Sequence, residues 1–335
     1  MMKKGFWEKL TLPIVGLAPM DGVTDAPMRF IAKKYGRPNV IYTEFVSVDG
    51  LWRIHKRGEM THKIWNELKF DKRKKPVVAQ LFGSDPQAFY EATKIVAPMG
   101  FDGIDINMGC PSPGLEKRGG GAGLMRDPVL AKEVVEAVRK AVEETGKEIS
   151  VSVKTRIGSV KPDIEWWKAL AAMELPAVAM HGRTFKQLYS GEADWEILKQ
   201  AAEIIKESGA LFLANGDVEK MISENEVLLT SGETKRIDED FDGVLIGRKA
   251  IGNPWILRRD GYEPSVEERL TTALEHARIF ERNLPGNKFE IMRKHLTWYA
   301  HGFDGAGSLR RRLVQTNSAD EVEEIVNEFL VEAKS

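Results

Sequence analysis

The sequence has a single cysteine, Cys110, among its 335 residues. One thiol excludes an intramolecular disulfide and a cysteine zinc site, so we expect no metal and a reducing, cytoplasmic location. The sequence also lacks a run of about eighteen apolar residues, so we expect no membrane span. We expect no export either, because Trp7, Glu8 and Lys9 stand where a signal peptide needs unbroken apolar sequence.

An excess of one charge sign is missing too. The 49 basic and 50 acidic residues give a formal net charge of −1, which argues neither for nor against a nucleic-acid partner. Hydrophobic residues make up 42% of the chain, enough for a sizeable core. The length fits one large α/β barrel and a smaller appendage.

Short apolar or β-branched runs recur along residues 14–250. Their sequences are IVGLAPM, NVIYTEF, VVAQLF, GIDINMGC, ISVSVKTRIG, AVAMHG, LFLANGDV and GVLIGRKA. Helical patterns lie between most of them, and Pro86 and Pro128 suit the first position of two of these helices. This alternation predicts the α/β class and a TIM (β/α)8 barrel. A doubly wound sheet is the alternative, but the glycine run at 119–123 lacks the G-x-G-x-x-G spacing often found there.

Beyond Pro264 only helical patterns follow. They predict a small all-helical C-terminal domain. We place the barrel at residues 1–262 and the helical domain at 263–335, with an extension that caps the barrel as the alternative.

Polar residues gather at the predicted strand ends, where TIM barrels carry their chemistry. The residues at these ends, most of them polar, are Pro19, Met20, Glu44, Gln80, Asn107, Cys110, Lys154, Arg156, His181, Arg183, Asn215, Gly216, Asp217, Gly247 and Arg248. The loops after strands seven and eight commonly bind phosphate, and Lys154 and His181 suit a ligand that becomes anionic on reduction. Flavin mononucleotide (FMN) fits both requirements. Two residues have structural alternatives: Asp217 as a helix N-cap, and Cys110 as a small core hydrophobe.

The motifs APMDGVTDAPMRF, GIDINMGCPSP, GGGAGLMRDP, VSVKTRIG, HGRTFKQLYSGEADW, LANGDV and GVLIGRKAIGNPW make the chain resemble the tRNA-dihydrouridine synthases. The resemblance runs from about residue 17 to 255, and MRKHLTWYAHG resembles the family's helical RNA-binding domain. It implies tRNA as partner, bound FMN, and NADPH as reductant, with NADH possible. We expect a monomer.

The resemblance also implies residue roles. Asn107 would contact the uracil, Cys110 would be the proton donor, and we add Arg156 and Arg183 as substrate-binding residues. The flavin would be held by Pro19, Met20, Gln80, Lys154, His181, Asn215, Gly216, Asp217, Gly247 and Arg248. Arg29 matches a family arginine without an assigned role. Two departures from the family pattern are Ser112-Pro113-Gly114, where a lysine is usual soon after Cys-Pro, and Lys249, where a small residue is usual.

Reducing the C5=C6 bond of uracil requires a hydride at C6 and a proton at C5. A thiol with an ordinary pKa of about 8.5 is largely protonated at neutral pH, so Cys110 suits the role of acid. Asn107 could donate its amide to the developing oxyanion or read the uracil edge.

A uridine must leave its stack to reach such a pocket, so the RNA needs a grip elsewhere. Residues 269–312 contain nine basic and four acidic residues, a net charge of +5. The candidate tRNA-binding residues are Arg293, Lys294, Arg310, Arg311 and Arg312. A solvated charged face is the alternative. We expect the acidic helix at 320–332 to face away from this basic segment. We interpret the basic run at 72–75, before strand three, as a solubility feature.

Two other functions remain open at this point. A flavin barrel could act on a free pyrimidine, as dihydroorotate and dihydropyrimidine dehydrogenases do, and would need no basic helical segment. Alternatively, an RNA-binding chaperone could have kept the barrel without the chemistry.

Overall fold

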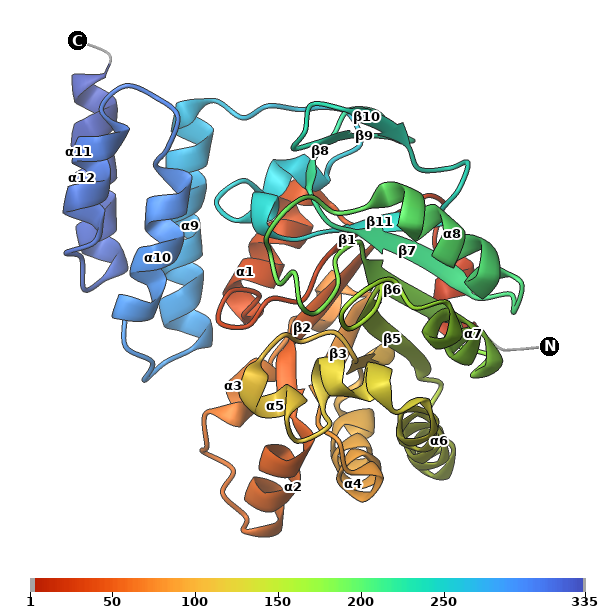
Figure 1. Ribbon diagram of the computed structural model, residues 1–335. Helices are drawn as coiled ribbons and strands as arrows, with labels where there is room; N and C mark the ends of the chain where they lie inside the picture. Colours follow the sequence, from red (N-terminus) through yellow and green to blue (C-terminus); the bar gives the residue numbers. More distant parts are fainter. Residues whose placement is uncertain (1–3, 334–335) are drawn as a thin grey trace.

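The computed structural model describes residues 4–333 of the chain (Figure 1). Eight parallel strands form a closed barrel in the order β1-β11-β7-β6-β5-β4-β3-β2. The strands are β1 (Ile14–Leu17), β2 (Val40–Ser47), β3 (Val77–Phe82), β4 (Gly103–Asn107), β5 (Ser150–Arg156), β6 (Ala177–His181), β7 (Leu211–Asn215) and β11 (Gly243–Ile246). Each coincides with a predicted run, which confirms the TIM barrel.

The barrel closes where β1 pairs with β11, from Ile14 opposite Gly243 to Leu17 opposite Ile246. The two backbones approach so closely that a Cβ atom at Gly243 would lie 2.1 Å from the carbonyl oxygen of Ile14. Glycine is therefore required at this point of the closure.

Side chains that alternate along the strands fill the barrel interior, as the two-residue period of a strand requires. The interior cluster includes Trp7, Ile14, Tyr42, Val78, Leu213 and Leu245. Trp7 belongs to the single turn η1 (Gly5–Lys9) and is 1% exposed, so it fills the N-terminal end of the barrel. A larger apolar cluster lies between the strands and the surrounding helices.

The outer helices begin at clear start signals. The side chains of Asp85 and Asp127 accept hydrogen bonds from the first turns of α4 (Pro86–Val96) and α6 (Pro128–Thr145), each with proline at its start, as predicted. The helices around the barrel are α1 (Ala26–Ile31), α2 (Val48–Lys56), α3 (Ile64–Glu67), α4 (Pro86–Val96), α5 (Pro113–Glu116), α6 (Pro128–Thr145), α7 (Ile164–Ala172) and α8 (Trp195–Lys206). Helical turns of the 3-10 or π type are η2 (Ala32–Gly36), η3 (Lys72–Lys74), η4 (Ala97–Met99), η5 (Gly121–Arg126), η6 (Arg248–Ala250) and η7 (Pro254–Leu257).

The segment between β7 and β11 differs from the prediction. In place of a crossover helix it forms a three-stranded antiparallel sheet, β8 (Val218–Met221), β9 (Glu226–Leu229) and β10 (Thr234–Arg236). Asp217 has a φ of +53° and leads into β8, so the helix N-cap interpretation of Asp217 is wrong. The alternation of short apolar and charged residues here is compatible with either element, and tertiary packing decided between them.

Four helices follow the barrel: α9 (Val266–Asn283), α10 (Glu290–Tyr299), α11 (Ala306–Leu313) and α12 (Ala319–Glu332). Figure 1 shows them as a bundle beside the barrel. They have their own apolar cluster, which includes Leu270, Phe280, Leu296 and Val322. We propose that this cluster is the core of a second domain beginning at residue 263. Within residues 4–333, no helix combines the length and apolar character that crossing a bilayer requires.

Candidate active site

A cavity of about 650 Å³ opens at the C-terminal rim of the barrel. Its walls contain all the residues predicted to contact cofactor or substrate, or to donate the proton: Pro19, Met20, Gln80, Asn107, Cys110, Lys154, Arg156, His181, Arg183, Asn215, Gly216, Asp217, Gly247 and Arg248. Closure of the barrel brings these distant segments together. The structure therefore places them in one pocket.

Glu44 is the exception among the polar strand-end residues. The pairing of β2 with β3 shifts register between Tyr42 and Phe45, so Phe45 rather than Glu44 lines the cavity. Such an irregularity changes the face to which the following side chains point. Burial is the main cause that raises the pKa of Glu44 to about 7, and the charge of Arg29 lowers it. Arg29 itself donates to the backbone oxygens of Thr24 and Lys69, so it ties two loops together.

Cys110 lies in a turn that its surroundings hold tightly. The Asn107 Oδ1 atom accepts hydrogen bonds from the backbone N–H of Gly109 (3.1 Å) and Cys110 (2.8 Å). Gly121, with a φ of +54°, packs so closely that a Cβ there would lie 3.1 Å from the Cys110 Cβ. The glycine run at 119–123 therefore supports the cysteine turn. Cys110 is 9% exposed and lines the cavity, so it is both a buried side chain and accessible to a ligand.

Burial raises the pKa of the Cys110 thiol above its ordinary value. The Asp21 carboxylate also raises it, while the cations Arg156 and Lys154 lower it. The balance keeps the thiol protonated at neutral pH, which suits a proton donor rather than a nucleophile.

Cationic and hydrogen-bond-donating groups line the inner end of the cavity. Burial lowers the pKa of Lys154 to about 8, and the charge of Arg156 lowers it too, while Asp105 raises it. Burial lowers the pKa of His181 well below its ordinary value, so its ring is neutral. The Arg183 Nη1 atom lies 3.3 Å from His181 Nε2. Because a guanidinium can only donate, Nε2 accepts and the ring proton belongs on Nδ1.

Arg183 and Asp217 form a buried two-pronged ion pair, with Nη1–Oδ1 at 2.8 Å and Nη2–Oδ2 at 2.6 Å. Asp217 also accepts from the backbone N–H of Ala193 at 2.7 Å and from Arg248 Nη2 at 3.3 Å. Its carboxylate therefore holds two arginines in place at the rim. Asn215 joins β7 to β11 through a 2.7 Å bond to the backbone oxygen of Leu245.

Arg156 and Arg183 hold the same loop from two sides. Arg156 donates to the backbone oxygens of Gly109 (2.8 Å) and Leu188 (3.0 Å), and Arg183 donates to that of Gly191 (2.6 Å). These contacts link the cysteine turn, the loop between β6 and α8, and the rim around Asp217. Both guanidiniums are thus bound within the protein.

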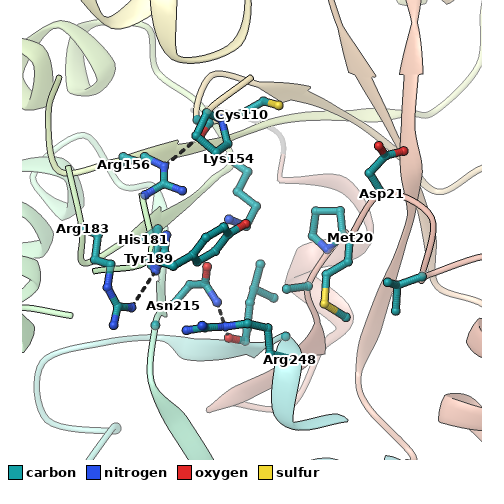
Figure 2. A pocket seen from close by; sticks show the side chains of 18 of the residues that line it. Met20, Asp21, Cys110, Lys154, Arg156, His181, Arg183, Tyr189, Asn215 and Arg248 are labelled. Carbon is teal, nitrogen blue, oxygen red and sulfur yellow. Dashed lines mark hydrogen bonds between the residues drawn. The ribbon is translucent and has the colours of Figure 1, made fainter. Parts of the chain in front are cut away.

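Tyr189, on that loop, is a pocket residue that the sequence analysis missed. Its side chain is 56% exposed, and its ring lies 4.9 Å from the guanidinium of Arg248 and 5.8 Å from that of Arg156. Figure 2 shows the ring reaching across the pocket between these arginines. The only sequence signal was its position in the motif HGRTFKQLYSGEADW, because an aromatic residue in a loop carries no spacing pattern of its own.

The two departures from the family pattern have clear positions. Lys249 Nζ lies 2.6 Å from Glu219 Oε2 on β8, so this lysine joins the rim to the extra sheet. Ser112, Pro113 and Gly114 are exposed at the start of α5. Among residues 4–333, no group of three or more His, Cys, Asp or Glu side chains is arranged to hold a metal ion.

Most of the predicted tRNA-binding cations are held within the helical bundle or against the barrel. Arg293 donates to the backbone oxygen of Thr316 (2.8 Å), Arg310 to that of Ala300 (2.7 Å), and Lys294 to that of Gly22. Arg312 pairs with Glu328 of α12, and Arg278 with Glu323 of the same helix. The acidic helix therefore packs against the basic ones, and the expectation that it faces away is wrong. Among the described residues of the bundle, Arg282, Lys288 and Arg311 are exposed cations whose side chains make no hydrogen bond or ion pair.

The raised pKa of the thiol gives a direct prediction. The thiolate is the form that reacts with iodoacetamide, so alkylation of Cys110 should accelerate only as the pH passes a midpoint above about 8.5. Mass spectrometry across a pH series measures this on one site, because no other cysteine exists in the chain. A midpoint below that of free cysteine would contradict the electrostatic balance described here.

The family model for dihydrouridine synthase (Dus) matches residues 16–334. A protein of Staphylococcus aureus (strain MRSA252) named probable tRNA-dihydrouridine synthase is 31% identical in an alignment of 334 positions that covers 98% of this chain and 96% of that protein. Probable tRNA-dihydrouridine synthase 2 of Bacillus subtilis (strain 168) is 30% identical over 98% of this chain and 97% of its own. Among solved structures, morphinone reductase has a TM-score of 0.45 and 13% identity, over 76% of this chain and 87% of its own. The full-length matches show that the chain belongs to the dihydrouridine synthase family and is an oxidoreductase.

Proposed function

We propose that this protein reduces the C5=C6 bond of specific uridines in tRNA, with bound FMN and with NADPH as reductant. The observation that carries the proposal is the meeting, in one cavity, of a protonated thiol, the amide of Asn107 and the cationic group around Lys154. The names of the full-length relatives support tRNA as substrate. NADPH is preferred to NADH on family resemblance alone.

The residues present fit FMN. A cavity of about 650 Å³ lies within the usual range of cofactor sites, roughly 300–1,000 Å³. At the rim, a Cβ at Gly247 would lie 3.6 Å from Met20 Sδ, so glycine keeps this part of the cavity clear. Arg248, next in the chain, would bind the phosphate, and Lys154 with His181 would face the part of the ring system that gains charge on reduction. Pro19, Met20, Gln80 and the 215–217 loop would complete the cofactor site.

Reduced FMN, when bound, would supply the hydride for C6 of the uracil. Cys110 would deliver the proton to C5 from Sγ, and its raised pKa keeps that proton available at neutral pH. Asn107 keeps one amide hydrogen free after donating to Gln80 Oε1 at 2.9 Å. That hydrogen would bind the uracil oxygen on which negative charge develops.

Arg156 and Arg183, predicted as substrate-binding residues, would act by positioning the loop that carries Tyr189. Their donors already engage backbone oxygens on either side of that residue. An exposed aromatic ring at the mouth of the pocket suits stacking on an RNA base. We therefore propose that Tyr189 contacts the bound RNA and that the two arginines order its loop.

We further propose that the helical bundle grips tRNA phosphates through Arg282, Lys288 and Arg311, and that Arg293, Lys294, Arg310 and Arg312 mainly hold the bundle together. The Asn66 side chain donates to that of Asn287 at 3.3 Å, which places the turn between α9 and α10 against the barrel. We also propose that the protein acts as a monomer. The lone cysteine supports the cytoplasm as the location.

The cofactor assignment predicts a yellow protein that releases FMN when denatured, detected by absorbance and chromatography. Arg248→Ala should weaken FMN binding about tenfold or more, because a charge-assisted hydrogen bond contributes about 1.5–3 kcal/mol. Arg258→Ala is the matched control, since Arg258 pairs with Asp260 outside the cavity. Release of only the dinucleotide form of the flavin would contradict the assignment of FMN as cofactor.

The acid role predicts that Cys110→Ala binds FMN and is reduced by NADPH at the normal rate. Its kcat for uridine reduction in tRNA should fall by about 10²–10⁴-fold, the usual contribution of a general acid. Stopped-flow absorbance separates the two half-reactions. Normal turnover in this variant would mean that another group protonates C5.

The charge assignment predicts that the triple variant Arg282→Glu, Lys288→Glu, Arg311→Glu binds tRNA more weakly than the natural chain. Its salt slope should flatten by about one unit for each lost phosphate contact. Lys147→Glu is the control, because this exposed residue precedes β5 and so lies at the end of the barrel opposite to the cavity. Unchanged tRNA affinity, with efficient reduction of free uracil, would favour a free-pyrimidine enzyme instead.

A further inference from the structure

A buried carboxylate lies one layer below the pocket. Asp105, in the middle of β4, is 0% exposed and does not line the cavity. Its Oδ1 accepts from Ser152 Oγ at 2.6 Å and its Oδ2 from Gln80 Nε2 at 2.7 Å. Strand pairing places Asp105 directly between Gln80 on β3 and Ser152 on β5. The mechanism described so far does not use this group.

A chain of hydrogen bonds runs from Asp105 to the cysteine turn, and each bond in it has a fixed donor and a fixed acceptor. An ionised carboxylate can only accept, so Gln80 must present its NH₂ group to Asp105. Gln80 Oε1 then faces Asn107 and accepts from Nδ2 at 2.9 Å. Asn107 Oδ1 in turn accepts from the backbone N–H of Cys110 at 2.8 Å. The chain starts at an acceptor, the Asp105 carboxylate, and ends at a donor, the backbone N–H of Cys110. Both amides must therefore point their NH₂ group toward Asp105 and their oxygen toward Cys110.

We propose that Asp105 is a positioning residue for the reaction: through Gln80 and Asn107 it fixes which amide atoms face the pocket and how the Cys110 turn is held. The role in the reaction rests on the proposed function, whereas the orienting role does not. With this order, Gln80 and Asn107 each keep one free N–H for the pocket. A reversed amide would offer an oxygen instead and would repel the negative charge that develops on the uracil.

The charge state of Asp105 supports this assignment of donors and acceptors along the chain of hydrogen bonds. Burial raises its pKa to about 6, and the hydrogen bonds from Ser152 and Gln80, with the charge of Lys154, lower it. The carboxylate is therefore ionised, and accepts only, at neutral pH. Its charge also raises the pKa of Lys154, which favours the cationic form of that side chain.

Three variants separate orientation from simple burial. Asp105→Leu removes the acceptor, Asp105→Asn keeps an oxygen that can accept from Gln80, and Ser152→Ala removes the other bond to the same carboxylate. The readouts are the alkylation rate of Cys110 by iodoacetamide against pH, measured on the protein as purified, and kcat and KM with tRNA. The alkylation readout needs no turnover and reports on one thiol only.

We expect Asp105→Leu to change the alkylation rate at least about fivefold and to lower kcat about 10-fold or more, with KM nearly unchanged. Asp105→Asn should restore both values to within about threefold, because the chain of hydrogen bonds can persist. Ser152→Ala should keep the normal alkylation profile even where it lowers the melting temperature. Such a pattern distinguishes positioning from a loss of stability.

A folded Asp105→Leu protein with a normal alkylation profile and normal kcat would overturn the proposal. If that variant does not fold, Gln80→Leu cuts the same chain one link closer to Cys110, and an unchanged profile there would overturn it equally. Failure of the proposed function has a different signature: the natural chain would not reduce tRNA, while the alkylation contrast among the variants would persist.

Discussion

Pairing of β1 with β11 closes the barrel, and every feature of the site depends on that closure. Parallel strands that close on themselves place all eight C-terminal ends at one rim. Cys110, Lys154 and Arg248 come from different thirds of the chain and meet only because of this constraint. The close approach of Gly243 to Ile14 shows how little space the closure leaves. A larger residue at 243 would therefore disturb the pocket as well as the fold.

Buried arginines then turn the rim loops into one connected unit. Arg156 links the cysteine turn to the loop that carries Tyr189, and Arg183 links the same loop to Asp217. Burying a guanidinium costs desolvation energy, and each of these offsets it with several hydrogen bonds of good geometry. Burial is the main cause that lowers the pKa of His181 and of Lys154, and the charge of Arg156 lowers both further.

In the helical bundle, the net charge counted along the sequence differs from the charge that the surface exposes to solvent. Its basic helices read as one strongly positive segment, yet α12 neutralises Arg278 and Arg312 by direct ion pairs. Arg293 and Arg310 satisfy backbone oxygens inside the bundle. If the bundle binds RNA as we propose, only the cations left in solvent would contact the phosphates, which makes that surface smaller than the sequence suggests.

The sequence by itself determined the barrel class, its eight strands and the residues at their ends, because strand periodicity and helix start signals are local. It also determined the position of Cys110 in its turn. Only the tertiary structure decided that an extra sheet replaces a helix before β11, that Phe45 rather than Glu44 faces the cavity, and that Asp217 holds Arg183. Those outcomes depend on strand register and on hydrogen-bond partners distant along the chain, and no local pattern encodes the distances that select them.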